Sequence, residues 1–130
     1  MQRINNIILG LVVWVAHSLT QRELERYHRQ MLIRNWGEKG QIRLKNARVT
    51  VAGAGGLGCP VLIYLTAAGI GHIRLVDNDR FELSNLNRQI LGWEKDIGKP
   101  KTQACQEKLK ALNSDINLRA MQVEITAENI

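Results

Sequence analysis

The chain has 130 residues, of which 45% are hydrophobic and 23% are charged, so it can form one domain with a hydrophobic core. The formal net charge of +6 favours an anionic ligand or an acidic protein partner. Aromatic residues amount to only 5% and no base-stacking motif is present, which argues against a nucleic-acid-binding protein.

Residues 1–19 form an apolar N-terminal extension, which we separate from the domain expected at residues 20–130. Residues 7–15 are an apolar run that is too short to span a bilayer, which takes roughly 20 residues. With Arg3 before it and Ala16 after it, the run faintly resembles a signal-peptide core. We do not expect export, because the sequence that follows is typical of a cytoplasmic protein. The apolar run is better explained as a segment that packs on a partner, or by a start site placed too far upstream. We therefore expect no membrane association.

A helix is predicted from about residue 20 to residue 33. Thr20 and Glu23 have the spacing of a capping box, and apolar residues then recur at helical spacing. Residues 35–37 end this helix, and residues 40–44 are predicted to form a short helical linker.

Strand-like and helix-like segments alternate over the rest of the chain. The predicted strands are residues 48–52, 73–76 and 118–123, and the predicted helices are residues 57–68 and 101–112. This order predicts an α/β fold, a Rossmann-like parallel sheet with flanking helices and right-handed crossovers.

Two further helices are expected outside this pattern. Ser84 is predicted to cap a short helix over residues 84–91. Thr126 is predicted to cap another helix that has Glu128 in its first turn, close to the C-terminus.

A glycine-rich turn, GAGGLG at residues 53–58, joins the first predicted strand to its helix, and Asp77 ends the second strand. Together they form a nucleotide-binding fingerprint. Gly53 permits the tight turn, Gly55 lets the backbone approach a phosphate, and Gly58 lets helix and strand pack closely. Asp77 would accept hydrogen bonds from both ribose hydroxyls. The alternatives are a turn that merely joins strand to helix and an Asp77 that caps the next helix.

Four segments resemble the ubiquitin-activating-enzyme superfamily in its ThiF-type adenylyltransferase form. They are RYHRQ (26–30), GAGGLG (53–58), VDNDRFELSNLNRQ (76–89) and GKPK (98–101), in the order and spacing of the family. The SNLNRQ segment is much more specific than the glycine turn. Similar enzymes adenylate ubiquitin-like sulfur-carrier proteins in the synthesis of molybdopterin, thiamine or thiolated tRNA, and the segments do not distinguish among these pathways.

The resemblance implies that a carboxylate at the C-terminus of the carrier attacks the α-phosphate of ATP, giving an acyl-adenylate and pyrophosphate. ATP and Mg2+ are the implied cofactors, and no metal ligand is assigned to the chain. The implied catalytic residues are Arg29, Arg88 and Lys101. The implied nucleotide-binding residues are Gly53, Gly55, Gly56, Gly58, Asp77, Asp79, Ser84, Asn85, Arg88 and Lys101.

Several of these residues have a second interpretation. The resemblance places Arg29 in the ATP site of a partner subunit, which implies a homodimer, but Arg29 could instead form a salt bridge on its own helix, and Arg26 could do either. Arg88 could form a surface ion pair. Asp79 could steer magnesium or hold a basic neighbour. Lys99 is expected to be solvated.

Family members are about twice this length by resemblance. Their second half supplies a further strand-end aspartate, the carrier-binding groove, often a zinc-binding pair of CxxC motifs and in many members a catalytic cysteine. We therefore expect this chain to supply the ATP-binding half and to be inactive alone, as a truncated gene product, a fragment of a longer sequence or one half of a split enzyme. A homodimer or a complementary second half is the expected assembly. A sheet of three strands would also expose an unpaired edge.

The two cysteines, Cys59 and Cys105, have no CxxC spacing, which argues against a structural zinc site. Both are expected to be small buried side chains, Cys105 on an inward helix face with Leu109 and Leu112. A reducing, cytoplasmic location is expected.

Two other functions stay open. An NAD-dependent oxidoreductase fragment would explain the glycine turn and Asp77, but not SNLNRQ or Lys101. A non-catalytic interaction subunit could lend Arg29 to a full-length partner. Preference for ATP over NAD would separate the first alternative from an adenylating enzyme.

Overall fold

The computed structural model describes residues 7–8, 11–12 and 15–129. Strands β1 (Ile7–Ile8) and β2 (Leu11–Val12) pair in antiparallel fashion. Residues 1–6, 9–10 and 13–14 of the apolar extension lie outside the described residues, and the packing of this extension on a partner stays a prediction. In the described residues, no helix has the length and apolar character needed to cross a membrane.

Three helices precede the sheet: α1 (Gln21–Arg26), α2 (His28–Met31) and α3 (Gly37–Asn46). The capping box that starts α1 is confirmed, because the backbone N–H of Glu23 donates to Thr20 Oγ1 at 3.2 Å and the N–H of Thr20 donates to Glu23 Oε2 at 2.7 Å.

The single helix predicted over residues 20–33 is wrong, because the helix is interrupted at Tyr27. The Tyr27 side chain is buried and its hydroxyl accepts a hydrogen bond from Asn113 Nδ2 at 2.8 Å. This tertiary contact outweighs the local helical pattern. The short helical linker predicted at residues 40–44 is helical, but it is longer than expected and forms the ten-residue helix α3.

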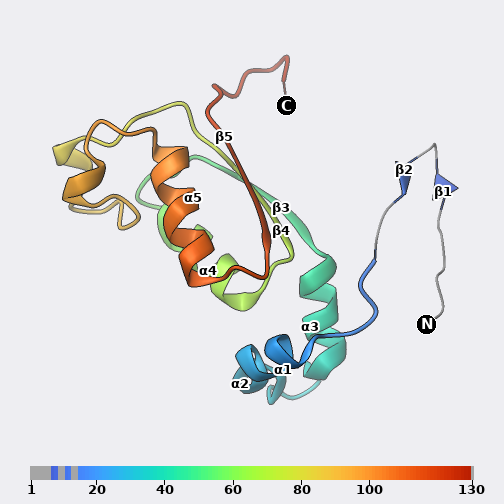
Figure 1. Cartoon of the computed structure of the whole chain (residues 1–130). Coiled ribbons are helices and arrows are strands. Elements are labelled where there is room, and N and C mark those ends of the chain that lie inside the picture. The colour runs from blue at the N-terminus through green and yellow to red at the C-terminus, as the bar shows by residue number, and fades with distance from the viewer. Residues whose placement is uncertain (1–6, 9–10, 13–14, 130) are drawn as a thin grey trace.

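Strands β3 (Arg48–Ala52), β4 (His72–Val76) and β5 (Asn117–Met121) form the predicted parallel sheet, and they lie in that order. Helices α4 (Gly58–Ala68) and α5 (Lys101–Leu112) connect the strands and lie on the same side of the sheet (Figure 1). The extents of β3 and α5 match the prediction, whereas β5 begins one residue earlier and ends two residues earlier than expected.

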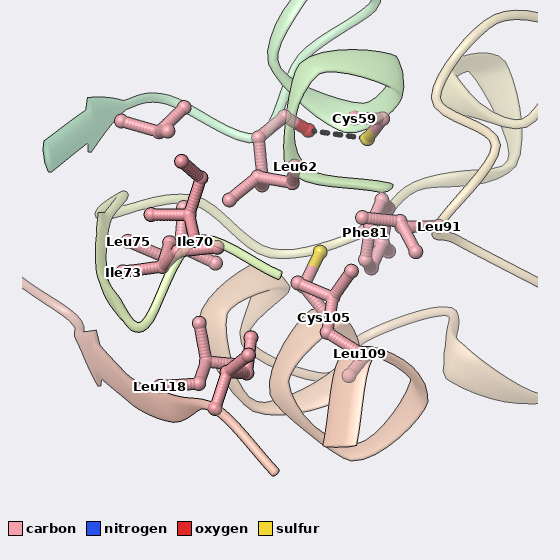
Figure 2. Close-up of a cluster of buried hydrophobic side chains, with 14 residues drawn as sticks. Cys59, Leu62, Ile70, Ile73, Leu75, Phe81, Leu91, Cys105, Leu109 and Leu118 are labelled. Carbon is pink, nitrogen blue, oxygen red and sulfur yellow. Dashed lines mark hydrogen bonds between the residues drawn. The ribbon is translucent and has the colours of Figure 1, made fainter. Parts of the chain in front are cut away.

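The hydrophobic core fills the space between the sheet and these two helices (Figure 2). Inward residues of the strands, such as Ile73 and Leu118, face Leu62 of α4 and Leu109 of α5. Cys59 and Cys105 are fully buried and free, as predicted. Leu112 does not share this face, because it is 42% exposed at the end of α5.

The helix predicted over residues 84–91 is wrong. Residues 84–91 form a 3-10 turn, η1 (Leu83–Asn85), followed by further turns. The cap lies at Glu82 rather than Ser84, because Asn85 Oδ1 accepts the backbone N–H of Glu82 at 3.0 Å. Burial of Phe81 and Leu91 in the core draws this segment into an irregular path.

Near the C-terminus, Thr126 starts only a single turn in the described residues. Its Oγ1 accepts the N–H of Glu128 at 3.3 Å, as a cap would, and its carbonyl accepts the N–H of Asn129 at 3.2 Å. No helix follows among residues 127–129.

Candidate functional site

The glycine turn lies where β3 ends and α4 begins, at the carboxyl edge of the parallel sheet. Gly53 has φ +93, a left-handed conformation that favours glycine. A Cβ at Gly58 would lie 1.9 Å from the carbonyl oxygen of Gly53, so the close packing of the turn requires glycine there. A Cβ at Gly55 would meet no atom within 4 Å, so the turn borders open space. The backbone N–H groups at the start of α4 therefore meet the conditions for binding a phosphate.

Asp77 follows β4 and fixes the shape of this turn. Its Oδ2 accepts the backbone N–H of Ala54 at 2.7 Å, and its Oδ1 accepts the N–H of Asp79 at 2.7 Å. Each carboxylate oxygen can accept a second hydrogen bond, so both remain capable of binding a hydroxyl group. The alternative role for Asp77 was to cap the next helix. Asp77 instead caps a turn at Asp79, and no helix begins there.

Arg88 packs against the same glycine turn from the segment after β4. A Cβ at Gly56 would lie 3.3 Å from Arg88 Cγ, so the two residues are in close contact. The guanidinium group donates to the carbonyl of Ser84 at 3.1 Å and to Asn87 Oδ1 at 3.0 Å. Arg88 is exposed and makes no ion pair with any described residue, so the surface ion pair considered from the sequence is not present.

Ser84 and Asn85 shape the segment that presents Arg88. The hydroxyl of Ser84 donates weakly to Glu82 Oε2 at 3.4 Å, and the Asn85 side chain caps the backbone of Glu82. The backbone N–H of Arg88 donates to the carbonyl of Asn85 at 3.2 Å. Asn85 and Arg88 are thus close together through a turn rather than through one face of an α-helix.

Lys101 begins α5 and meets Asp79. Its Nζ lies 3.1 Å from Asp79 Oδ2, and its backbone N–H donates to the carbonyl of Asp79 at 3.0 Å. The Lys101 side chain is only 7% exposed, whereas that of Asp79 is 73% exposed. Asp79 therefore holds a basic neighbour, one of the two roles predicted for it. Lys101 contacts Asp79, and Asp77, two residues before Asp79, contacts the glycine turn. Lys101 is therefore linked to the end of β4 that meets this turn.

Arg29 lies away from these residues. It is exposed on α2, and the next residue, Gln30, donates to the carbonyl of Ala68 at 2.8 Å, at the end of α4 opposite the glycine turn. The length of α4 separates the two ends by about 16 Å. Arg29 makes no salt bridge with a described residue, whereas Arg26 lies 3.4 Å from Asp115. Arg26 therefore forms a salt bridge, whereas Arg29 forms none with a described residue.

A buried ionic cluster was missed from the sequence. Asp96, at the end of η2 (Glu94–Asp96), is fully buried and contacts Lys99 and Lys108. Lys99, which was expected to be solvated, is partly so: its side chain is 39% exposed, while its Nζ lies 3.2 Å from Asp96 Oδ1. Burial alone would raise the pKa of Asp96, but hydrogen bonds from Lys108, Lys99 and the backbone N–H of Trp93 hold it below the ordinary value of 3.8. The sequence has no local signal for this cluster, because Lys108 lies twelve residues from Asp96 and only the fold brings the two together.

Cys59 lies in the first turn of α4, beside the site. Its Sγ donates to the carbonyl of Ala54 at 3.2 Å, inside the core (Figure 2). The neighbouring Cys59 thiol, together with burial, raises the pKa of Cys105. In the described residues, no group of three or more histidine, cysteine or acidic side chains is arranged to hold a metal ion.

A glycine turn at the carboxyl edge of a parallel sheet, held by a strand-end aspartate, defines a Rossmann-like nucleotide-binding domain. The ThiF family matches residues 27–130, and the chain belongs to this family.

Among curated proteins, the chain is 52% identical over 110 residues to the sulfur carrier protein adenylyltransferase of Thermus thermophilus, covering 85% of this chain and 41% of that protein. It is 44% identical over 114 residues to the probable adenylyltransferase/sulfurtransferase MoeZ of Mycobacterium tuberculosis, covering 88% of this chain and 29% of that protein. The chain thus spans less than half the length of these relatives.

Solved structures share the fold. PaaA superposes with a TM-score of 0.78 and 30% identity, covering 96% of this chain and 39% of that chain. MccB of E. coli, in a crystal structure with ATP, superposes with a TM-score of 0.70 and 39% identity, covering 78% of this chain and 31% of that chain.

Proposed function

We propose that this chain supplies the ATP-binding half of a site that adenylates the C-terminal carboxylate of a ubiquitin-like sulfur-carrier protein. One observation carries the proposal: Asp77 and Arg88 both contact the glycine turn, so an acid that would bind ribose and a base that would bind phosphate lie at one helix N-terminus.

The residues divide between two tasks. The glycine turn, with open space at Gly55, would receive phosphate, and Asp77 would accept the ribose hydroxyls. Asn85 would support this binding from the segment next to the turn. Arg88 and Lys101 would neutralise negative charge as pyrophosphate leaves, which is how a site without a covalent nucleophile promotes adenylyl transfer. ATP supplies the adenylyl group when bound, and Mg2+ would accompany its phosphates.

The names of the relatives support this substrate class. The Thermus thermophilus relative is called a sulfur carrier protein adenylyltransferase, and the MccB structure was solved with ATP. The proposed partner is therefore a sulfur-carrier protein of the molybdopterin, thiamine or tRNA-thiolation type, which would react through its C-terminal carboxylate. We place the reaction in the cytoplasm.

Arg29 would contribute to the nucleotide site of a partner subunit rather than to the site of its own chain. It is exposed, makes no ion pair with a described residue and lies beyond the far end of α4 from the glycine turn. A homodimer with composite sites, or a complementary second half, would bring this guanidinium to a nucleotide. The same exposure is compatible with an interaction subunit that lends Arg29 to a full-length partner.

Calorimetry with ATP–Mg2+ on the purified chain tests the proposal, with NAD as the parallel ligand. We expect ATP to bind weakly and NAD not to bind. Arg88→Ala should abolish ATP binding, whereas Lys110→Ala, an exposed residue on α5, should not change it. Binding of NAD without ATP would support the oxidoreductase alternative and refute the proposal. Failure of a folded chain to bind either nucleotide would also refute the proposal.

A further inference from the structure

Asp96 is held by three separate groups in the interior of the protein. Its Oδ1 lies 3.2 Å from Lys99 Nζ, and its Oδ2 accepts the backbone N–H of Trp93 at 3.1 Å and a hydrogen bond from Lys108 Nζ. The Asp96 side chain has no exposed surface. Aspartate is almost never fully buried unless it is paired, so these partners are needed to keep its charge there.

The three ionic residues, which we call the Asp96 cluster (Asp96, Lys99 and Lys108), join two parts of the chain. Asp96 and Lys99 belong to the segment that leads into α5, whereas Lys108 belongs to α5 itself. Lys108 follows Lys101 by seven residues, about two helical turns, so the two lysines lie on nearly the same side of the helix. The cluster therefore fixes how α5 is rotated relative to the segment before it.

That segment is also attached to the extension of β4. The N–H of Gly98 donates to the carbonyl of Phe81 at 2.8 Å, and the N–H of Phe81 donates to the carbonyl of Lys99 at 3.0 Å. Arg80 and Pro100 form an antiparallel bridge. The next bond in this series is the one from the N–H of Lys101 to the carbonyl of Asp79, beside the ion pair of their side chains.

We propose that Asp96 is a positioning residue for Lys101: through Lys99 and Lys108 it holds the start of α5 so that the Lys101 amine stays at Asp79, beside the glycine turn. Asp96 itself touches no substrate, because it is fully buried. The inference rests on the proposed function only where it assigns the Lys101 amine to the triphosphate.

A pair of lysines beside Trp93 offers a matched comparison. Lys95 Nζ lies 4.9 Å and Lys108 Nζ 4.5 Å from the centre of the Trp93 ring, but only Lys108 reaches Asp96. Lys108→Met removes the link between α5 and Asp96, whereas Lys95→Met removes a cation near the same ring and leaves the cluster intact. Asp96→Asn is the second variant.

The first measurement is the rate at which each lysine amine is methylated, followed by mass spectrometry. The Lys101 amine should react slowly in the parent chain because its side chain is 7% exposed. We expect Lys108→Met to raise the methylation rate of the Lys101 amine roughly fivefold, because the start of α5 would open to solvent more often. The rate at Lys45, which pairs with Glu23 elsewhere in the fold, should not change.

The second measurement is ATP affinity in a double-mutant cycle. Lys108→Met should weaken ATP binding about tenfold in the parent background and have no further effect in a Lys101→Ala background, because residues of one network are not additive. Lys95→Met should leave the affinity unchanged. An additive loss in both backgrounds would indicate a structural role and overturn the inference.

The two measurements separate the inference from the proposed function. If ATP does not bind the parent chain, the proposed function fails, but the methylation rates still report on Lys101. Unchanged Lys101 rates in Lys108→Met and Asp96→Asn would overturn the positioning role. Equal acceleration at Lys101 and Lys45 would also overturn it, because that result means general unfolding.

Discussion

At the scale of single residues, glycine is needed in the turn for two different reasons: packing within the protein and the approach of a ligand. Gly58 is required by packing, because a Cβ there would overlap the carbonyl of Gly53. Gly55 borders open space, so the protein itself does not require glycine at that position. A requirement for glycine there would come from a ligand that approaches the backbone.

We therefore expect opposite outcomes for two alanine variants. Gly58→Ala should lower the free energy of unfolding by about 1–3 kcal/mol, the usual cost of overpacking. Gly55→Ala should keep the free energy of unfolding and weaken ATP binding. Urea denaturation and calorimetry on both variants check this pair, and a strongly destabilised Gly55→Ala would contradict the assignment.

At the scale of elements, the outer face of the sheet is basic. Arg48, Arg74 and Arg119 are exposed on its three strands, and Arg74 is the register partner of Arg119. The strands themselves contain no acidic residue. Like charges on neighbouring strands destabilise a sheet, so this face lowers the stability of the isolated fold.

Replacing one arginine should relieve the repulsion. We expect Arg74→Glu to raise the free energy of unfolding by roughly 0.2–1 kcal/mol at low salt, with a smaller gain at high salt. The double variant Arg74→Glu/Arg119→Asp restores like charges and should lose the gain. Denaturation midpoints of the three proteins at two salt concentrations measure this effect, and an equal gain in the double variant would exclude the register-pair explanation.

How far the sequence predicts this fold depends on where the decisive contacts lie. Strand β3 and helix α5 match their predictions because their apolar periodicity and the glycine or proline at their ends are local signals. The helix expected at residues 84–91 is absent because burial of Phe81 and Leu91 determines its path. The Asp96 cluster was missed because Lys108 lies twelve residues away and only the fold brings it there.

At the scale of the whole molecule, stability should decrease in two stages as the pH falls. Burial, together with Arg48 and Arg119, lowers the pKa of His72 below 6.5, so the unfolded chain binds a proton more readily and stability is lost as the pH falls through that value. The pKa values of Asp96 and Glu23 are also lowered, despite burial, by their lysine partners. Their contribution is present above about pH 4 and is lost below it.

Urea denaturation between pH 7 and pH 3 measures both stages. We expect His72→Asn to remove the loss that begins as the pH falls through about 6.5 and to leave the acid stage in place. The same pH dependence in His72→Asn and in the parent chain would show that another group is responsible for the first stage.

The hydrogen bond between Tyr27 and Asn113 spans 86 positions of the chain, and the contact of Arg22 with Asp115 spans 93. Such distant contacts form late, because the intervening chain must lose its freedom before they stabilise anything. The N-terminal helices should therefore dock only after α5 and β5 are in place, and they should be the first to detach again. Backbone amides of α2, the helix of Arg29, should then exchange hydrogen with solvent faster than those of β4.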